Sequence, residues 1–132
     1  MIAKEDIESW LIRTELDFEE IDDGIWIVRP ATGEEAAVPE PPVMLSYQPP
    51  VILMRAAMRD APEEDDQRLR LYRRLLELNA TDLVHGSYGL EDGEVVISDT
   101  LELETLDFEE FRASLESLTL AVTSHGPELA TD

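Results

Sequence analysis

Two histidines and their polar neighbours are the first side chains of this 132-residue chain to consider for chemistry. His85 is followed by Gly86 and Ser87, and a serine close to a histidine suggests a nucleophile with its base. Adjacent residues of a strand point to opposite faces, however, and no third group that would orient the histidine is evident. We therefore favour a solvent-facing strand histidine and predict no catalytic residue.

The remaining polar candidates fit no metal or cofactor pattern. His125 falls near the end of a predicted helix, where the helix dipole favours a cationic side chain. The acidic runs at residues 22–23, 63–66 and 109–110 lack the alternating spacing and central glycine of a calcium loop. The chain has no cysteine, and its sequence has no glycine-rich phosphate loop. We expect no metal and no cofactor.

The first half of the chain predicts one helix and three strands. Apolar residues recur at helical spacing within residues 3–15. An Asp-Gly pair, a strong hairpin signal, separates two short strands, and the proline-rich residues 30–42 predict a flexible loop. Residues 43–58 are apolar on both faces, but Pro49 and Pro50 cannot donate to a sheet. We expect a bent or broken third strand there.

The second half predicts a helix, two strands and a final helix. Residues 66–80 carry apolar side chains at helical spacing, and a second Asp-Gly turn joins two strands of alternating polarity. Asp99 falls on the apolar face of the second of these strands, so we expect a β-bulge or a buried polar contact. Asp107 predicts the N-cap of a helix with a regular apolar stripe, which we expect to end near residues 125–127.

These elements predict the class of the fold. Their order is helix, strand, strand, strand, helix, strand, strand, helix, which indicates an α+β fold with an antiparallel sheet packed by helices. The pentapeptide LDFEE occurs twice, and we assign residues 16–20 to a strand and residues 106–110 to the start of a helix. The length suits one domain, so we predict a single domain over residues 1–132.

The charge of the chain argues against several classes of partner. Thirty-one acidic residues against ten lysines and arginines give a net charge of -21, which repels phosphate backbones and anionic lipids. We therefore expect no nucleic-acid partner and no membrane. The first residues lack the layout of a signal peptide, and the absence of cysteine is typical of reducing compartments, so the sequence predicts a cytoplasmic protein. The acidity itself fits a solubility device, adaptation to salt, or an acidic scaffold for a partner.

The apolar content exceeds what we expect a single layer of three helices to cover. Two tryptophans, several methionines and the two-sided strand account for this surplus: Trp10, Trp26, Met44, Leu45, Tyr47, Met54 and Met58. Pairing of two identical chains across a two-fold axis is the economical way to cover such a surface. We expect a homodimer.

Four segments resemble a known family. They are GIWIVRP, VMLSYQPPVILMRAAM, LYRRLLELNA running into LVHGSYGLEDGEVVISDTLEL, and the acidic amphipathic helix from Asp107. Together with the order of elements, they resemble the type III secretion chaperone-like (Tir chaperone) superfamily, and especially its YbjN-like branch. The proline-rich loop and the Pro49-Pro50 break depart from the secretion chaperones proper, which favours that branch.

The resemblance implies a small acidic homodimer without catalytic activity that binds an extended segment of a client protein. It places client contacts on the first helix and the sheet, at Trp10, Leu11, Ile25, Ile27 and Leu45. It places dimer contacts on the second helix and the neighbouring strand, at Leu71, Leu75, Leu78, Val84 and Tyr88. The alternative is a small-ligand-binding or regulatory module with a pocket near the two tryptophans and no role in export.

Overall fold

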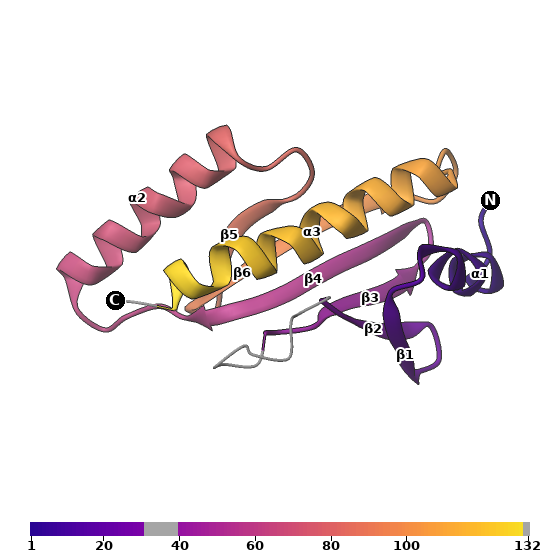
Figure 1. Cartoon of the computed structure of the whole chain (residues 1–132), viewed down its shortest axis with the longest axis horizontal. Coiled ribbons are helices and arrows are strands. Elements are labelled where there is room, and N and C mark those ends of the chain that lie inside the picture. The colour runs from indigo at the N-terminus through magenta and orange to yellow at the C-terminus, as the bar shows by residue number, and fades with distance from the viewer. Residues whose placement is uncertain (31–39, 131–132) are drawn as a thin grey trace.

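The computed structural model describes residues 1–30 and 40–130. Within these residues the elements are α1 (Lys4–Thr14), β1 (Asp17–Asp22), β2 (Ile25–Arg29), β3 (Val43–Gln48), β4 (Val51–Asp60), α2 (Asp65–Thr81), β5 (Ser87–Glu91), β6 (Glu94–Glu102) and α3 (Phe108–Leu129) (Figure 1). The strands form one antiparallel sheet in the order β1-β2-β3-β4-β6-β5. The predicted α+β class is confirmed. Most of the loop predicted at residues 30–42 lies outside the described residues.

The apolar segment of residues 43–58 forms two strands where we expected a single bent or broken one. The chain turns at Pro49 and Pro50, and β4 runs back along β3 with Gln48 opposite Val51. Prolines cannot donate to a ladder, and at this position they lie in the turn, where no ladder bond is needed. The sheet therefore has six strands instead of the expected five.

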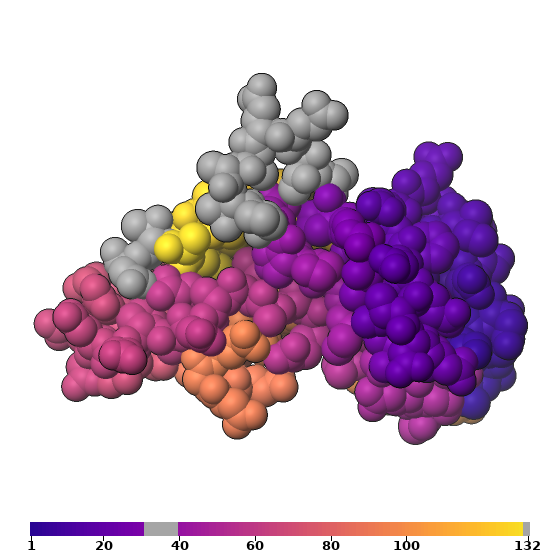
Figure 2. Space-filling model, turned by 90° about the horizontal axis from the view of Figure 1, so that it is seen from below, coloured from indigo at the N-terminus to yellow at the C-terminus, as the bar shows by residue number. Residues whose placement is uncertain are grey.

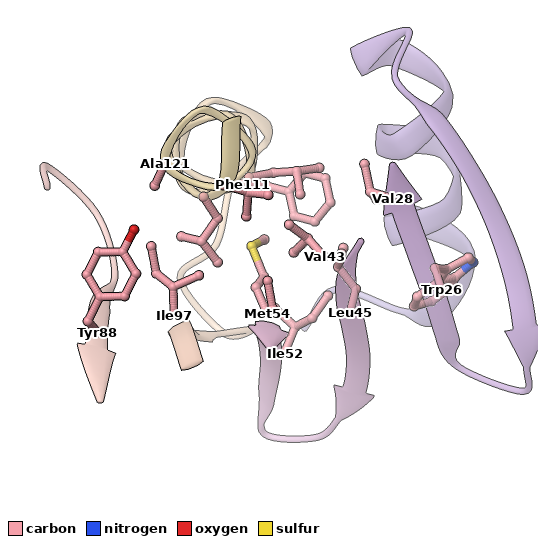
Figure 3. Close-up of a cluster of buried hydrophobic side chains, with 14 of the residues drawn as sticks. Trp26, Val28, Val43, Leu45, Ile52, Met54, Tyr88, Ile97, Phe111 and Ala121 are labelled. Carbon is pink, nitrogen blue, oxygen red and sulfur yellow. The ribbon is translucent and has the colours of Figure 1, made fainter. Parts of the chain in front are cut away.

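All three described helices pack on the same face of the sheet. Figure 3 shows α3 end-on above the strands, with side chains of β3, β4 and β6 pointing toward it. Helix α1 is tied to this face by Tyr47, whose hydroxyl donates to the carbonyl of Ile2 at 2.8 Å. The core lies between the helices and this face, and its largest fully buried side chains are Ile7, Leu11, Trp26, Leu45, Ile52, Met54, Leu78, Ile97, Leu103, Phe111, Leu115 and Leu118.

Helix α3 begins as predicted and ends later. The Asp107 side chain accepts a hydrogen bond from the backbone N–H of Glu110 at 2.8 Å, which is the expected N-cap. The helix continues past Pro127 to Leu129, although a proline removes one backbone hydrogen bond. Leu129 is buried and its carbonyl accepts from Arg59 at 2.9 Å, so tertiary packing stabilises this last turn.

Asp99 makes a polar contact with α3 that is partly buried, where we expected a β-bulge or a buried polar contact. Its carboxylate accepts a hydrogen bond at 2.9 Å from the hydroxyl of Ser114, a buried residue of α3. The irregularity of register between β4 and β6 lies elsewhere, between Ala57 and Arg59. Asp99 therefore joins the sheet to α3 and does not mark a bulge.

Helix α2 is held to the rest of the molecule at three places. Its apolar stripe packs into the core, and the side-chain amide of Asn79 bonds both the N–H of Tyr88 (2.7 Å) and its carbonyl (3.1 Å). Arg74 forms two hydrogen bonds with Glu128 of α3, at 2.7 and 3.1 Å. The Arg74 guanidinium lowers the pKa of Glu128 below its ordinary value.

The substitution Arg74→Gln should raise the pKa of Glu128 toward that of an ordinary glutamate. Because the folded-state pKa is lowered, the stabilisation from this pair is present above the unfolded-state pKa and is lost as the pH falls through the folded-state value. Both side chains are nearly half exposed, so we expect a small contribution to stability. An NMR titration of the Glu128 side chain in both proteins measures the change, and identical titration curves would contradict the prediction.

Candidate functional site

The face of the sheet opposite the helices is the candidate site. Cross-strand register places Ile27 beside Met44, Ser46 beside Leu53, and Ala57 beside Val96 on this face. None of the three described helices covers it, and in Figure 2 atoms of the magenta strands reach the surface between the indigo N-terminal part and the pink α2. We call this surface the bare face and define it by its apolar residues Ile25, Ile27, Met44, Val51, Leu53, Ala57 and Val96.

The apolar residues of the bare face differ in their exposure to solvent. All are half-buried except Val96, which is 5% exposed. They come from β2, β3, β4 and β6, so the apolar surface runs across the middle of the sheet. Apolar side chains that lie side by side on an uncovered sheet are typical of a protein-binding surface.

Charged residues lie on both sides of this apolar surface. On the β1 side, Arg29 contacts Glu19 at 3.1 Å and Asp17 at 3.9 Å. On the β5 and β6 side, Arg55 contacts Glu91 at 3.0 Å and Glu94 at 3.5 Å. Each guanidinium therefore already faces two carboxylates.

The structure brings together two of the five residues expected to contact a client. Ile25 and Ile27 lie on the bare face. Leu11 and Leu45 are fully buried in the core on the helix side of the sheet. Trp10 is half-buried on α1, with ring centroids 5.5 Å from Phe111 and 6.2 Å from Phe108. Sequence reasoning missed Met44, Val51 and Leu53, although the apolar character of both faces of residues 43–58 contained that signal.

Four of the five residues expected at a dimer interface contribute to the protomer's own core. Leu71, Leu75, Leu78 and Tyr88 are each at most 8% exposed, whereas Val84 is 84% exposed. The outward side of α2 instead carries two other leucines that are more than two-thirds exposed, Leu69 and Leu76. Their spacing of seven residues is the sequence signal for a second apolar stripe on this helix.

Val84 lines a shallow groove between α3 and the connection from α2 to β5. The groove measures about 240 Å³ and its lining includes Leu120, a residue of α3 that is 65% exposed. A second groove, of about 270 Å³, lies between α2 and the end of α3 and is lined by Arg70, Arg74 and Leu129 among others. Neither groove contains Trp10 or Trp26, near which the alternative hypothesis expected a ligand pocket.

The histidines take part in structural contacts. His125 Nδ1 lies 2.7 Å from the Tyr88 hydroxyl, and its Nε2 lies 3.4 Å from Asp82. Burial, more than the nearby carboxylates of Glu128 and Asp82, raises the pKa of Tyr88, so this phenol remains protonated. Among the described residues no hydrogen bond joins a serine hydroxyl to either imidazole, and His85 contacts Ser117 through its backbone carbonyl.

Metal-binding groups and membrane-spanning helices are also absent from the part of the chain that the structure describes. Residues 1–30 and 40–130 contain no group of three or more acidic or histidine side chains placed to hold a metal ion. No helix within these ranges is long and apolar enough to cross a membrane. The distinctive feature of the described surface is therefore its apolar sheet face.

Comparison with known families agrees with this arrangement of helices and sheet. The family model CesT_Tir_1 matches residues 2–131. The chain belongs to the CesT_Tir_1 family. A comparison with curated proteins finds no match.

Solved structures show that the CesT_Tir_1 chain shares its fold with type III secretion chaperones and with YbjN. A chain of the heterodimeric ExoU–SpcU complex from the type III secretion system of Pseudomonas aeruginosa aligns with a TM-score of 0.67 and 17% identity, covering 92% of this chain and 95% of that one. YbjN from E. coli aligns with a TM-score of 0.62 and 14% identity, covering 96% and 93%. A chain of the HopA1–SchA chaperone–effector complex aligns with a TM-score of 0.55 and 14% identity, covering 87% of this chain and 85% of that one.

These matches confirm the resemblance seen in the sequence. The chain has a chaperone-like fold related to that of effector-binding type III secretion chaperones. Sequence identities of this size support a shared fold.

Proposed function

We propose that this chain is a non-enzymatic, homodimeric chaperone-like or adaptor protein that binds an extended segment of a client protein on its bare face. The observation that supports this proposal most directly is the position of all three described helices on one face, so that no described helix lies over the apolar residues of the other face. An extended segment fits such a surface because alternate side chains of a strand point to the same side.

Substitution of Ile27 tests the client surface. Ile27→Asp places a charge in the middle of the bare face and should weaken binding of an unfolded model client at least about tenfold, because an apolar partner cannot pair a buried carboxylate. A fluorophore-labelled, unstructured peptide with a row of alternating apolar residues and uncharged flanking residues is a suitable probe, and fluorescence anisotropy measures its binding.

The matched control is Leu90→Asp. Leu90 is 49% exposed and lies on the opposite face of the sheet, so the same change there should leave binding unaltered. Circular dichroism checks that both variants fold, and Ile27→Ser replaces Ile27→Asp if the latter does not. Equal binding by the wild type and a folded Ile27 variant would contradict the proposed surface.

The homodimer is proposed to form through the outward side of α2, around Leu69 and Leu76. The net charge of the chain makes any dimer repulsive, but α2 carries four arginines (Arg68, Arg70, Arg73 and Arg74) against three acids (Asp65, Asp66 and Glu77). Self-repulsion is therefore low on this helix, and its exposed leucines gain stability when they leave water. The exposed Val84 and Leu120 provide further apolar surface for a partner chain.

Light scattering after size-exclusion chromatography tests the dimer. We expect a mass of two chains for the wild type, with tighter association at high salt because salt screens exposed charges beyond about 10 Å. Leu76→Glu should shift the mass to one chain, whereas Ile12→Glu, at a residue of α1 that is 64% exposed, should not. A wild type that remains a monomer at low and high salt would contradict the proposed homodimer.

A further inference from the structure

The bare face has an excess of negative charge around its apolar residues. Register places seven carboxylates on the same face, those of Asp17, Glu19, Asp22, Asp60, Glu91, Glu94 and Glu102. The basic side chains that the described strands place there are Arg29 and Arg55. Most of the carboxylates are at the sides, on β1, β5 and β6, while the apolar residues other than Val96 lie between them on β2, β3 and β4.

The existing ion pairs do not remove this excess. Arg29 and Arg55 each contact two carboxylates, so two of the four contacted carboxylates remain uncompensated. Glu102 is exposed and makes no ion pair within the described residues. The contacted carboxylates remain accessible to a partner: the exposed fraction is 71% for Asp17, 58% for Glu19, 56% for Glu91 and 37% for Glu94.

The carboxylates beside the apolar surface favour a partner with positive charge. An acidic segment would bring like charges together, and a second copy of this chain docked face to face would do the same with its own carboxylates. A segment that carries lysine or arginine on both sides of an apolar row would pair these charges while its apolar side chains cover the middle of the face. Charge complementarity of this kind increases the association rate and suppresses wrong partners.

We propose that the bare face recognises a basic client segment, one in which apolar residues are flanked by lysines or arginines. This inference rests on the proposed function of the same surface, and it adds the chemical class of the partner. The acidic side residues and the apolar centre then have separate roles, because the carboxylates select the segment and the apolar residues hold it.

The binding of three labelled peptides of equal length tests this inference separately from the proposed function. They share one row of alternating apolar residues and carry four lysines, four serines or four glutamates at the flanking positions. We expect the lysine peptide to bind at least about tenfold more tightly than the serine peptide at low salt, since exposed ion pairs each add a modest increment. This preference should shrink as salt is added.

The outcomes are distinct. Equal binding of the lysine and serine peptides would overturn the basic-client inference and leave the proposed function standing. Absence of binding by all three peptides would overturn both. Tightest binding by the glutamate peptide would overturn the inference directly.

A double variant links the preference to the bare face. Asp17→Asn with Glu102→Gln removes two of its carboxylates, and we expect the preference for the lysine peptide over the serine peptide to fall several-fold. Glu63→Gln with Asp66→Asn is the control, because it changes the net charge equally at exposed positions just before and at the start of α2. An equal fall in both double variants would show that only the net charge matters and would overturn the assignment to this face.

Discussion

Phe111→Ala should lower the free energy of unfolding by about 3–5 kcal/mol, which is a large part of the stability of a typical domain. Phe111 is fully buried, and α3 places its ring above the strands (Figure 3). Its ring centroid lies 5.5 Å from that of Trp10 of α1. The substitution therefore removes contacts with the sheet and with α1 together. Urea denaturation followed by circular dichroism measures the change.

Ser124→Ala is the control for Phe111→Ala on the same helix. Ser124 is exposed, and alanine favours helix, so we expect no loss of stability. An unchanged urea midpoint for Phe111→Ala would contradict the central position of α3 in the core.

Gly86→Ala should lower the free energy of unfolding by about 2–4 kcal/mol, through two separate effects. Gly86 has φ +79°, a conformation that side chains disfavour. A Cβ atom there would also lie 2.8 Å from Cδ1 of Leu118 and 3.0 Å from the carbonyl oxygen of Ser98. The connection from α2 to β5 would have to move away from α3 to accept it.

Substitutions at two other glycines distinguish the effect of backbone strain on stability from the effect of the close contact with Leu118. Gly93 has the same φ of +79°, but a Cβ there meets nothing within 4 Å, so Gly93→Ala should show the backbone effect alone, about 1–2 kcal/mol. Gly89 also has open space and no positive φ, so Gly89→Ala should change stability by less than about 0.5 kcal/mol. Equal losses at Gly86 and Gly93 in urea denaturation would show that the contact with Leu118 contributes nothing.

Turn chemistry and periodicity predicted most of the fold from the sequence. Both Asp-Gly pairs form the expected hairpin turns, at residues 23–24 and 92–93. The two copies of LDFEE adopt the two expected structures, a strand after Leu16 and a helix start after Asp107. The same five residues differ in outcome because the residues that follow them supply a hairpin turn in one case and a helical stripe in the other.

The sequence was less able to show which surfaces remain uncovered. Helix α2 has leucines on two sides, and periodicity predicts a helix without saying which side meets the sheet. The structure buries Leu71, Leu75 and Leu78 and leaves Leu69 and Leu76 outside. Likewise, residues 43–58 indicated a strand covered on both faces, but the described helices cover one of them. Periodicity does not distinguish a strand face that a segment of the same chain covers from one that a partner covers.

The pairing of Asn79 with Tyr88 also limits how identical chains can associate. β5 is an edge strand, and a free edge is a template for polymerisation by strand addition. The Asn79 amide occupies both outward backbone groups of Tyr88, so a side chain blocks strand addition at this point of the edge. The other edge, β1, carries the sequence DFEEID, whose charges repel a second copy of itself. The two edges thus resist fibre growth by different means: at β5 the Asn79 side chain occupies backbone groups of Tyr88, and at β1 the charges of the strand repel a second copy.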